Sequence, residues 1–232
     1  NWLRRHVRRG GYHTVESLIG SFIPSLEHAA GHLWSVLPYA LAEATTLPLV
    51  WGQPYRHTVD DPTRGTVPIC GTLHRATRPS KKLVILIHGI GATPKEAYLL
   101  RMARTLTRDG HDVLSLALRG SVCEGSDHYH AGLIDDLVAV FGDSALSHYQ
   151  DIFLVGSSLG GQIALRYGLD AAGDRLRGIV SICAPISMKA SQLALDAPGM
   201  VAYRHGILMI LKRKYRQLAR NGLREGQAVL AD

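Results

Sequence analysis

The sequence predicts an α/β fold in which a mainly parallel sheet is flanked by helices. Apolar runs at 83–87 and 152–155 both break into glycine-containing turns, and helical patterns separate the predicted strands. Short, wholly apolar runs suit strands that are buried on both faces of a parallel sheet. A chain of 232 residues with 46% hydrophobic content can bury one sizeable core. We therefore expect a single α/β core.

Six strands are predicted, each a short apolar or alternating run bounded by turn residues. The first two are expected to form a hairpin, because the segment at 60–65 between them is rich in Asp, Pro and Gly. The later strands are expected to lie parallel, with right-handed crossovers. The ranges are 55–59, 67–75, 82–88, 111–118, the run from 152 into Gly156, and 176–184.

Helices are predicted between and after these strands. The clearest start is at Pro94, with Thr93 as the cap and Glu96 three residues after that cap, and this helix stops before Gly110. Two further helices follow the last strand, where apolar residues recur at roughly helical spacing. The predicted ranges are 94–108, 132–148, 162–170, 188–195 and 200–221.

Three parts of the chain differ in character: a helical segment at 1–50, the α/β core at 51–184 and a helical segment at 185–232. The stretch 17–50 is apolar but interrupted by proline, histidine and glutamate, so it lacks the roughly 20 uninterrupted apolar residues of a bilayer span. We expect amphipathic helices that pack on the core or lie on a membrane. The basic start is not interpreted as a signal peptide.

Charge and cysteine content argue against several classes of protein. The chain has 26 Lys and Arg against 19 Asp and Glu, a net charge of +7, which suits an acidic partner or an anionic membrane surface. The basic clusters lack the aromatic interleaving or helix-turn-helix pattern of nucleic-acid binding. Cys70, Cys123 and Cys183 are odd in number and lack Cys-x-x-Cys spacing, so neither a disulfide framework nor a zinc site is predicted. This favours a reducing, cytoplasmic compartment.

Ser158 is the predicted nucleophile. A strand that turns into a helix within one residue crowds its apex, and Gly156 and Gly160 remove the side chains that would collide there. The hydroxyl of Ser158 is then exposed, and the N–H of Leu159 opens the next helix, where it can donate to a developing oxyanion. The motif also arises by chance in Gly-rich loops, but the strand before it and the helix after it favour a catalytic turn.

The strand at 82–88 supplies the other half of the site. It breaks into His88-Gly89-Ile90, and the loop can aim the N–H of Ile90 at the same oxyanion. His88 lies beside a glycine at a strand end, so we interpret it as a residue that orders the loop by hydrogen bonds rather than as a catalytic base.

These motifs resemble the α/β-hydrolase family, and more narrowly its YheT-like branch of esterases and phospholipases, over roughly 51–220. The resemblance implies an α/β-hydrolase fold with a helical lid, a serine esterase mechanism without metal or organic cofactor, and a small ester or lipid-like substrate. The turn at 121–125 and Ala117 depart from the family pattern. The site-supporting positions are His88, Gly89, Arg119, Gly120, Tyr129, His130, Gly132, Asp136, Gly156 and Gly160.

The partners of Ser158 are not found in the sequence. His130 and Asp136 precede the serine, whereas the family order is serine, acid, histidine, so His130 is expected to hold the loop and the pocket wall. Asp135 and Asp136 also suit the first turn of a helix. His205 is the only histidine after Ser158, and it is not assigned as the base. Two strands that would carry acid and base are missing, so we expect a fragment that is inactive alone.

The leading functional hypothesis is a serine hydrolase that cleaves carboxylic esters. An acyltransferase that uses the same serine and a non-catalytic ligand-binding protein remain as alternatives. Lys212 to Arg216 could contact anionic lipid as a peripheral membrane site, or form the solvated face of an ordinary helix, which we prefer. No nucleic-acid partner is expected.

Overall fold

The computed structural model describes residues 52–122 and 127–220, so the helical segment predicted at 1–50 lies outside the described residues. The described strands form one mixed sheet in the order β1-β2-β4-β3-β5-β6. Strands β3 to β6 are mutually parallel, and β2 joins them antiparallel to β4. The strand bounds are β1 Gln53–Asp61, β2 Gly65–His74, β3 Lys82–Ile87, β4 Asp112–Ala117, β5 Asp151–Ser157 and β6 Leu176–Ile182.

The predicted hairpin is confirmed, but its turn is tighter than expected. The antiparallel ladder of β1 and β2 extends to the pair Asp61 and Gly65, so the turn is three residues rather than six. The Asp61 carboxylate accepts the N–H groups of Thr63 and Arg64 at 2.9 and 3.0 Å, which closes the turn from its side chain.

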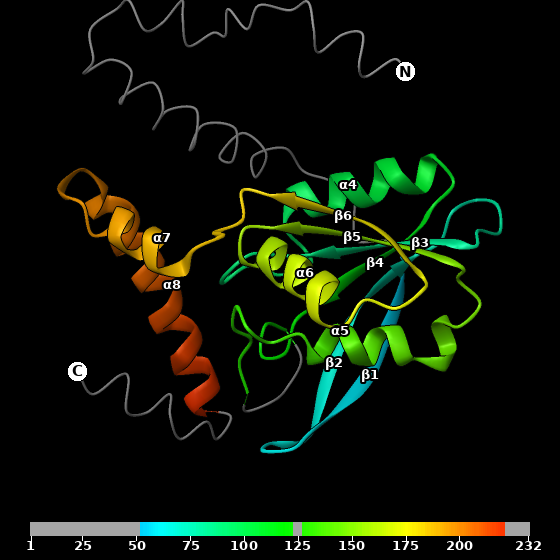
Figure 1. Cartoon of the computed structure of the whole chain (residues 1–232), viewed down its shortest axis with the longest axis horizontal. Helices are drawn as coiled ribbons and strands as arrows, with labels where there is room; N and C mark the ends of the chain where they lie inside the picture. The colour runs from blue at the N-terminus through cyan, green and yellow to red at the C-terminus, as the bar shows by residue number, and fades with distance from the viewer. Residues whose placement is uncertain (1–51, 123–126, 221–232) are drawn as a thin grey trace, which may run out of the picture. The chain divides into compact units, whose positions relative to one another are not determined.

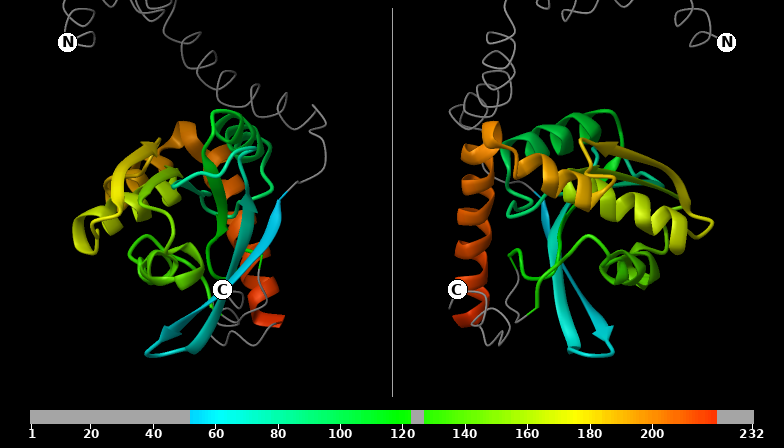
Figure 2. Two further views of the ribbon diagram at one scale, coloured as in Figure 1. Left: turned by 90° about the vertical axis from the view of Figure 1, so that its right-hand side faces the viewer. Right: turned by 60° about the vertical axis from the view of Figure 1, so that its left-hand side comes forward.

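Helices cover both faces of the sheet (Figures 1 and 2). On one face, α4 (Ala97–Arg108) packs through Leu99 and Ala103 against Val84 and Leu86 of β3. On the other face, α5 (Asp135–Gly142) and α6 (Leu159–Asp170) join a larger core that contains Ile85 and Ile87. Alternate residues of β3 thus serve opposite layers, which explains why this strand is apolar throughout.

The helix predicted at 94–108 begins at Ala97, three residues later than expected. Thr93 and Glu96 form a separate turn: the Glu96 carboxylate accepts the Thr93 N–H at 3.2 Å, and the Thr93 hydroxyl oxygen accepts the Lys95 N–H at 3.2 Å. The predicted capping residues therefore bond to each other as a capping box does, but the regular helix starts only after Glu96.

The helix predicted at 132–148 is shorter than expected. The α-helix α5 ends at Gly142, and a short 3₁₀ helix, Ser144–Leu146, follows it. The Asp143 carboxylate accepts the N–H of Ala145 at 2.8 Å, so this side chain starts a new turn rather than continuing the α-helix. Asp135 and Asp136 do lie in the first turn of α5.

Two helices follow β6: α7 (Met188–Leu195) and α8 (Val201–Arg220). They lie beside the ends of β5 and β6 rather than on a face of the sheet (Figure 1). The first matches its predicted range, and the second agrees within one residue at its start. Over the described ranges, no helix is both long and apolar enough to cross a membrane.

The cysteines correct one prediction. Cys70 on β2 is disulfide-bonded, although the cysteine count and spacing predict no disulfide. Cys183, directly after β6, is a free and exposed thiol. Spacing rules indicate zinc sites and disulfide frameworks of small secreted domains, but they do not predict a single disulfide bond.

Candidate active site

Ser158 occupies a sharp turn between β5 and α6. Its backbone has φ 53° and ψ −124°, a region that residues with a side chain rarely adopt. The turn is held on both sides: the Ser158 N–H donates to Ile182 O of β6 at 2.8 Å, and the Ser158 carbonyl accepts the N–H of Gly161 at 3.0 Å. The strained residue is exposed, whereas Leu159 behind it is buried. The predicted nucleophile thus stands at the apex of the turn.

The flanking glycines are required by close backbone contacts. A Cβ on Gly156 would lie 2.3 Å from the carbonyl oxygen of Gly160, and a Cβ on Gly160 would lie 2.4 Å from that of His88. Both distances are far below van der Waals contact, and the opposing atoms belong to backbone, which cannot move cheaply. The strand, the helix and the loop after β3 therefore meet only because both positions lack a side chain.

The loop after β3 lies against the serine. A Cβ on Gly89 would be 3.1 Å from the Ser158 Cβ and 3.6 Å from its Oγ. Residues 89–92 form a turn in which the Ala92 N–H donates to Gly89 O at 3.4 Å, and Gly91 has φ 68°. Among the described residues, the N–H groups of Ile90 and Leu159 have no hydrogen-bond partner, which leaves both predicted donors free for an oxyanion.

A cavity of about 450 Å³ opens beside Ser158. Ser158, Leu159 and Ile90 line it from the core, and α7 and α8 line it from the other side. Most of the lining is apolar, with the pair Arg204 and Asp196, 3.5 Å apart, as the charged exception. The apolar contributors from the two helices include Met188, Leu195, Ile207, Leu208 and Leu211.

Two further residues near the site are not assigned to it in the sequence analysis: one lines the cavity and the other lies over the loop after β3. Cys183, with φ 52°, follows the last residue of β6 and lines the cavity beside the serine. Ile210 of α8 lies over the loop after β3, where a Cβ on Gly91 would collide with it. The rule that sites form at the carboxyl ends of parallel strands could have indicated Cys183. No local pattern indicates Ile210.

His88 is buried behind the loop and bonds only to neighbouring groups. Its Nδ1 lies 2.8 Å from Gly89 O, and its Nε2 accepts the Leu118 N–H at 3.3 Å and lies 3.2 Å from the Ser121 hydroxyl. These contacts place the proton on Nδ1, where it donates to the carbonyl. Burial lowers the pKa of His88 to about 4, with the Lys214 charge acting in the same direction. A neutral imidazole with both nitrogens engaged fits an ordering role.

Arg119 is the centre of a buried ion cluster. Its Nε donates to Asp136 at 2.7 Å, and its Nη1 donates to Asp61 at 2.7 Å and to Asp127 at 2.8 Å. Its backbone N–H also donates to Asp136. Burial disfavours the Arg119 charge, but the carboxylates outweigh it and hold its pKa above the usual value, while the Arg119 hydrogen bond lowers that of Asp61. The cluster fastens the β1–β2 hairpin, the 127–136 segment and β4 together.

The remaining predicted site-supporting residues lie in different surroundings from one another: Gly120, Tyr129, His130 and Gly132. Gly120 has φ 69°, and a Cβ there would lie 2.1 Å from Asp127 O. Tyr129 is buried against the loop after β3. His130 is exposed, accepts the Gly132 N–H at 3.2 Å and is not among the residues that line the cavity. His130 thus orders a local turn, and its expected place in the pocket wall stays a prediction.

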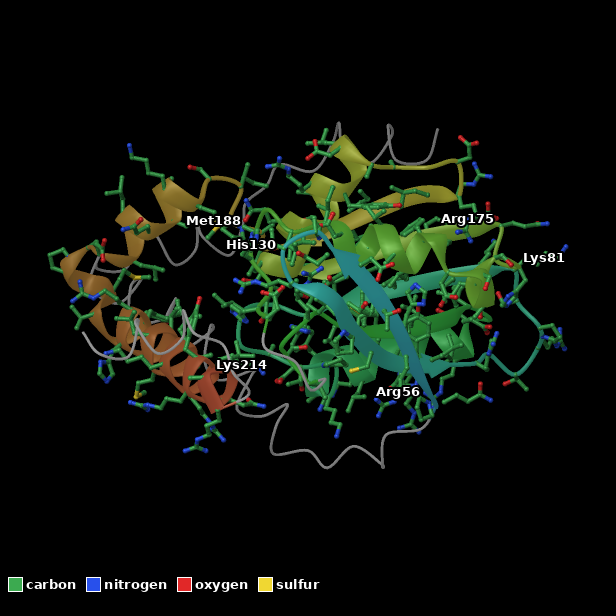
Figure 3. The ribbon with its side chains drawn as sticks, turned by 90° about the horizontal axis from the view of Figure 1, so that it is seen from below. Arg56, Lys81, His130, Arg175, Met188 and Lys214 are labelled. Carbon is green, nitrogen blue, oxygen red and sulfur yellow. The ribbon has the colours of Figure 1, made fainter. Side chains whose placement is uncertain are left out.

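His128 and Lys214 form a second electrostatic feature. Lys214 lies on the side of α8 that faces the core (Figure 3) and donates to the carbonyl of Ser121. The His128 ring packs between Tyr129, at 4.6 Å, and Tyr215 of α8, at 5.4 Å. Burial, followed by the charge of Lys214, lowers the pKa of His128 to about 4. The contacts of Tyr215 with His128 and of Lys214 with Ser121 join α8 to the segments on either side of the gap at 123–126, next to the Arg119 ion cluster.

Stability is expected to fall in mild acid because of these two histidines. Their folded-state pKa values of about 4 lie below the ordinary value near 6.5, so between these limits mainly the unfolded chain binds the protons. The contribution of these two histidines to the free energy of unfolding is therefore fully present above pH 6.5 and is lost as the pH falls toward 4. Urea titrations at pH 7.0 and 5.0 should show a smaller loss for His128→Gln than for the parent chain. An equal loss would contradict this assignment.

A general base is not among the described lining residues. No histidine of the described ranges lines the cavity, and His205 on α8 is exposed and is not a lining residue. Asp196 is the one lining carboxylate among them, and it faces Arg204. Across the same ranges, no three His, Cys, Asp or Glu side chains converge as metal ligands would. The described part of the site supplies a serine and two N–H donors.

Comparisons place the chain in a family. The model of the alpha/beta hydrolase family matches residues 84–231. An esterase of Pyrococcus furiosus has a similar structure in two crystal forms. The first has a TM-score of 0.52 and 18% sequence identity, and the match covers 71% of this chain and 65% of the esterase. The second has a TM-score of 0.51 and 20% identity, and the match covers 62% of this chain and 59% of the esterase. Est1E from Butyrivibrio proteoclasticus has a TM-score of 0.48 and 18% identity, and the match covers 62% of this chain and 57% of Est1E.

The chain spans less than two thirds of the length of each of these structures. None of the curated proteins matches it. At these identities the structural likeness concerns the fold alone, and that fold agrees with the six-stranded mixed sheet and its flanking helices. The family model covers more than half of the chain, including the loop after β3 and the turn at Ser158. The chain therefore belongs to the alpha/beta hydrolase family.

Proposed function

We propose that the protein is a serine hydrolase of carboxylic esters. The observation that carries this proposal is the strained, exposed Ser158 beside an apolar cavity that Ile90 and Leu159 also line, two residues whose N–H groups have no hydrogen-bond partner among the described residues. The Ser158 Oγ would attack the ester carbonyl, its proton passing to a base, and the carbonyl oxygen would become an oxyanion held by the two N–H groups. Collapse of this intermediate would break the ester C–O bond, and the alcohol would leave with the proton from the base. Water would then hydrolyse the acyl-enzyme to the free acid and restore the Ser158 hydroxyl.

The cavity favours a substrate with an apolar acyl or alcohol part. Most of its lining is apolar, and its volume of about 450 Å³ suits a small ester or one chain of a lipid-like ester. Contact of α8 with anionic lipid belongs to the same proposal, because Lys212, Arg213 and Arg216 are exposed and exposed Leu208 and Met209 precede them. We also propose membership of the YheT-like branch, in which α7 and α8 act as the lid.

The base and acid are proposed to come from outside the described residues, because the described cavity wall contains no histidine. A chain without them keeps the positioned serine and the oxyanion donors, so it should react slowly rather than not at all. Exogenous imidazole can take the role of the absent base in a cavity of this size.

A non-catalytic ligand-binding protein is the second candidate, and the same absence of a lining histidine favours it. An alkyl fluorophosphonate, with and without imidazole, separates the two. For a hydrolase we expect one adduct per chain, mapped by peptide mass spectrometry to Ser158 and formed faster with imidazole. No adduct on Ser158 under either condition would reject the hydrolase. Product analysis with a competing alcohol then distinguishes hydrolysis from acyl transfer.

A further inference from the structure

The Tyr129 hydroxyl bridges both sides of Ile90. It donates to Gly89 O at 3.0 Å and accepts the Gly91 N–H at 2.7 Å. Tyr129 is 1% exposed, and its ring lies edge-on to His88 with the centroids 5.3 Å apart. Burial raises the pKa of Tyr129 to about 12, so the hydroxyl keeps its proton and can donate. Nothing in this arrangement requires contact between Tyr129 and a substrate.

The geometry of a peptide bond gives this bridge a consequence for the oxyanion donor. Gly89 C=O and Ile90 N–H belong to one planar, trans peptide unit, so they point in opposite directions. When Tyr129 and His88 hold the carbonyl on the core side, the Ile90 N–H is directed away from the core, toward the cavity that Ile90 and Ser158 share. The bond from Gly91 N–H fixes the next peptide unit in the same way.

We infer that Tyr129 is the positioning residue of the oxyanion hole, acting through the two peptide units on either side of Ile90. This inference rests on the proposed function and deepens it. Among the described residues, Tyr129 is the one partner of the Gly91 N–H, whereas the Gly89 carbonyl has three donors. Loss of the hydroxyl should therefore leave the Gly91 N–H without a partner. The peptide units on either side of Ile90 could then rotate, and the Ile90 N–H would no longer be held toward the cavity.

Tyr129→Phe tests the inference, because it removes the hydroxyl and keeps the ring contacts with His88 and His128. We expect the rate constant for phosphonylation of Ser158 within the bound complex to fall roughly tenfold or more, since a single oxyanion donor accounts for about 10²–10³ in rate. The dissociation constant of the reversible complex should stay within about twofold, because Tyr129 does not line the cavity. A fall in affinity with an unchanged rate constant would overturn the inference.

Tyr149→Phe is the matched control. Tyr149 is fully buried, and its hydroxyl also makes two hydrogen bonds, to Asp112 at 2.6 Å and from Arg75 at 2.6 Å, away from the cavity. Both variants should lose comparable stability in urea titrations, but Tyr149→Phe should label at the parent rate. Equal slowing in both variants would show a general effect of lost stability and would overturn the positioning role.

Amide hydrogen exchange separates this inference from the proposed function. In Tyr129→Phe, the amides of Gly91 and Ala92, which are hydrogen-bonded in the parent chain, should exchange faster, while those of β3 and β5 stay protected. This result would support the positioning of the loop even if Ser158 failed to label in every variant, an outcome that would reject the hydrolase alone. Unchanged exchange at Gly91 and Ala92 would overturn the inference whatever the labelling shows.

Discussion

Ser158→Ala is expected to remove the imidazole-dependent hydrolysis of a small ester such as p-nitrophenyl acetate. No histidine lines the described part of the cavity, and added imidazole can take the proton of Ser158 as it attacks. General-base assistance typically contributes 10²–10⁴-fold, so the parent chain with saturating imidazole should exceed Ser158→Ala by about 10²-fold. The measured quantity is the initial rate after subtraction of the reaction of imidazole with the ester alone.

Ser157→Ala is the control for this measurement. Ser157 is the last residue of β5 and directly precedes the nucleophile, but it does not line the cavity. Its substitution should leave the imidazole-dependent rate within about twofold, the scatter expected for a residue that takes no part in the transition state. If Ser158→Ala retained the parent rate while Ser157→Ala lost it, the assignment of the nucleophile would be wrong. Equal loss in both would indicate damage to the turn.

The turn at Ser158 could be predicted from the sequence because its causes are local. Gly156 and Gly160 are two residues from the serine, and the apolar strand before it and the helix after it are continuous with the motif. The same holds for the hairpin and for the strand at 82–88. The position of Leu159 as the first helical residue follows from the motif as well.

The contacts that hold the site together are not local, and the sequence does not predict them. Arg119 meets Asp61 and Asp127, which lie 58 and 8 residues away, and the two belong to different parts of the fold. Arg119 and Asp136 are recognisable as motif positions, but only the fold brings the residue after β4, the first turn of α5 and the hairpin turn together. Tyr129 is a similar case, because its bond to Gly91 spans 38 residues.

The observed helix bounds differ from the predicted ones where a side chain bonds to a backbone N–H at the helix end. Asp143 ends α5 early by accepting the N–H of Ala145, although the apolar spacing around it continues. Glu96 delays α4 because its carboxylate turns back to Thr93. Periodicity indicates which residues face the core, but it does not show which carboxylate will bond to a backbone N–H.

Arg119→Met is expected to lower the free energy of unfolding by about 3–5 kcal/mol. The guanidinium is fully buried, and three carboxylates bond to it. Methionine fills much of the same volume but removes the cation to which Asp61 and Asp136 bond, and it leaves Asp127 paired only with Arg64 at 3.8 Å. A buried carboxylate that loses its partner must be protonated, hydrated or exposed, and each of these costs stability.

The comparison variant is Arg166→Met. Arg166 pairs with Asp170 on α6 at 2.5 Å, a distance as short as those in the cluster, but the two side chains are 57% and 40% exposed. Solvent screens such a pair, so its loss should cost no more than about 1 kcal/mol. Urea titrations of both variants measure the difference directly. A loss below about 1 kcal/mol in Arg119→Met as well would show that the cluster does not stabilise the fold.

The charge itself can be tested by adding Asp136→Asn to Arg119→Met. If uncompensated carboxylates cause the loss, the double variant should be more stable than the sum of the two single effects predicts, because the second change removes a charge that the first left unpaired. If Arg119→Met does not fold, Asp127→Asn serves instead: it removes one charge-assisted bond and should cost about 1.5–3 kcal/mol. Additive effects in the double variant would mean that Arg119 acts through packing of its methylene groups rather than through its charge.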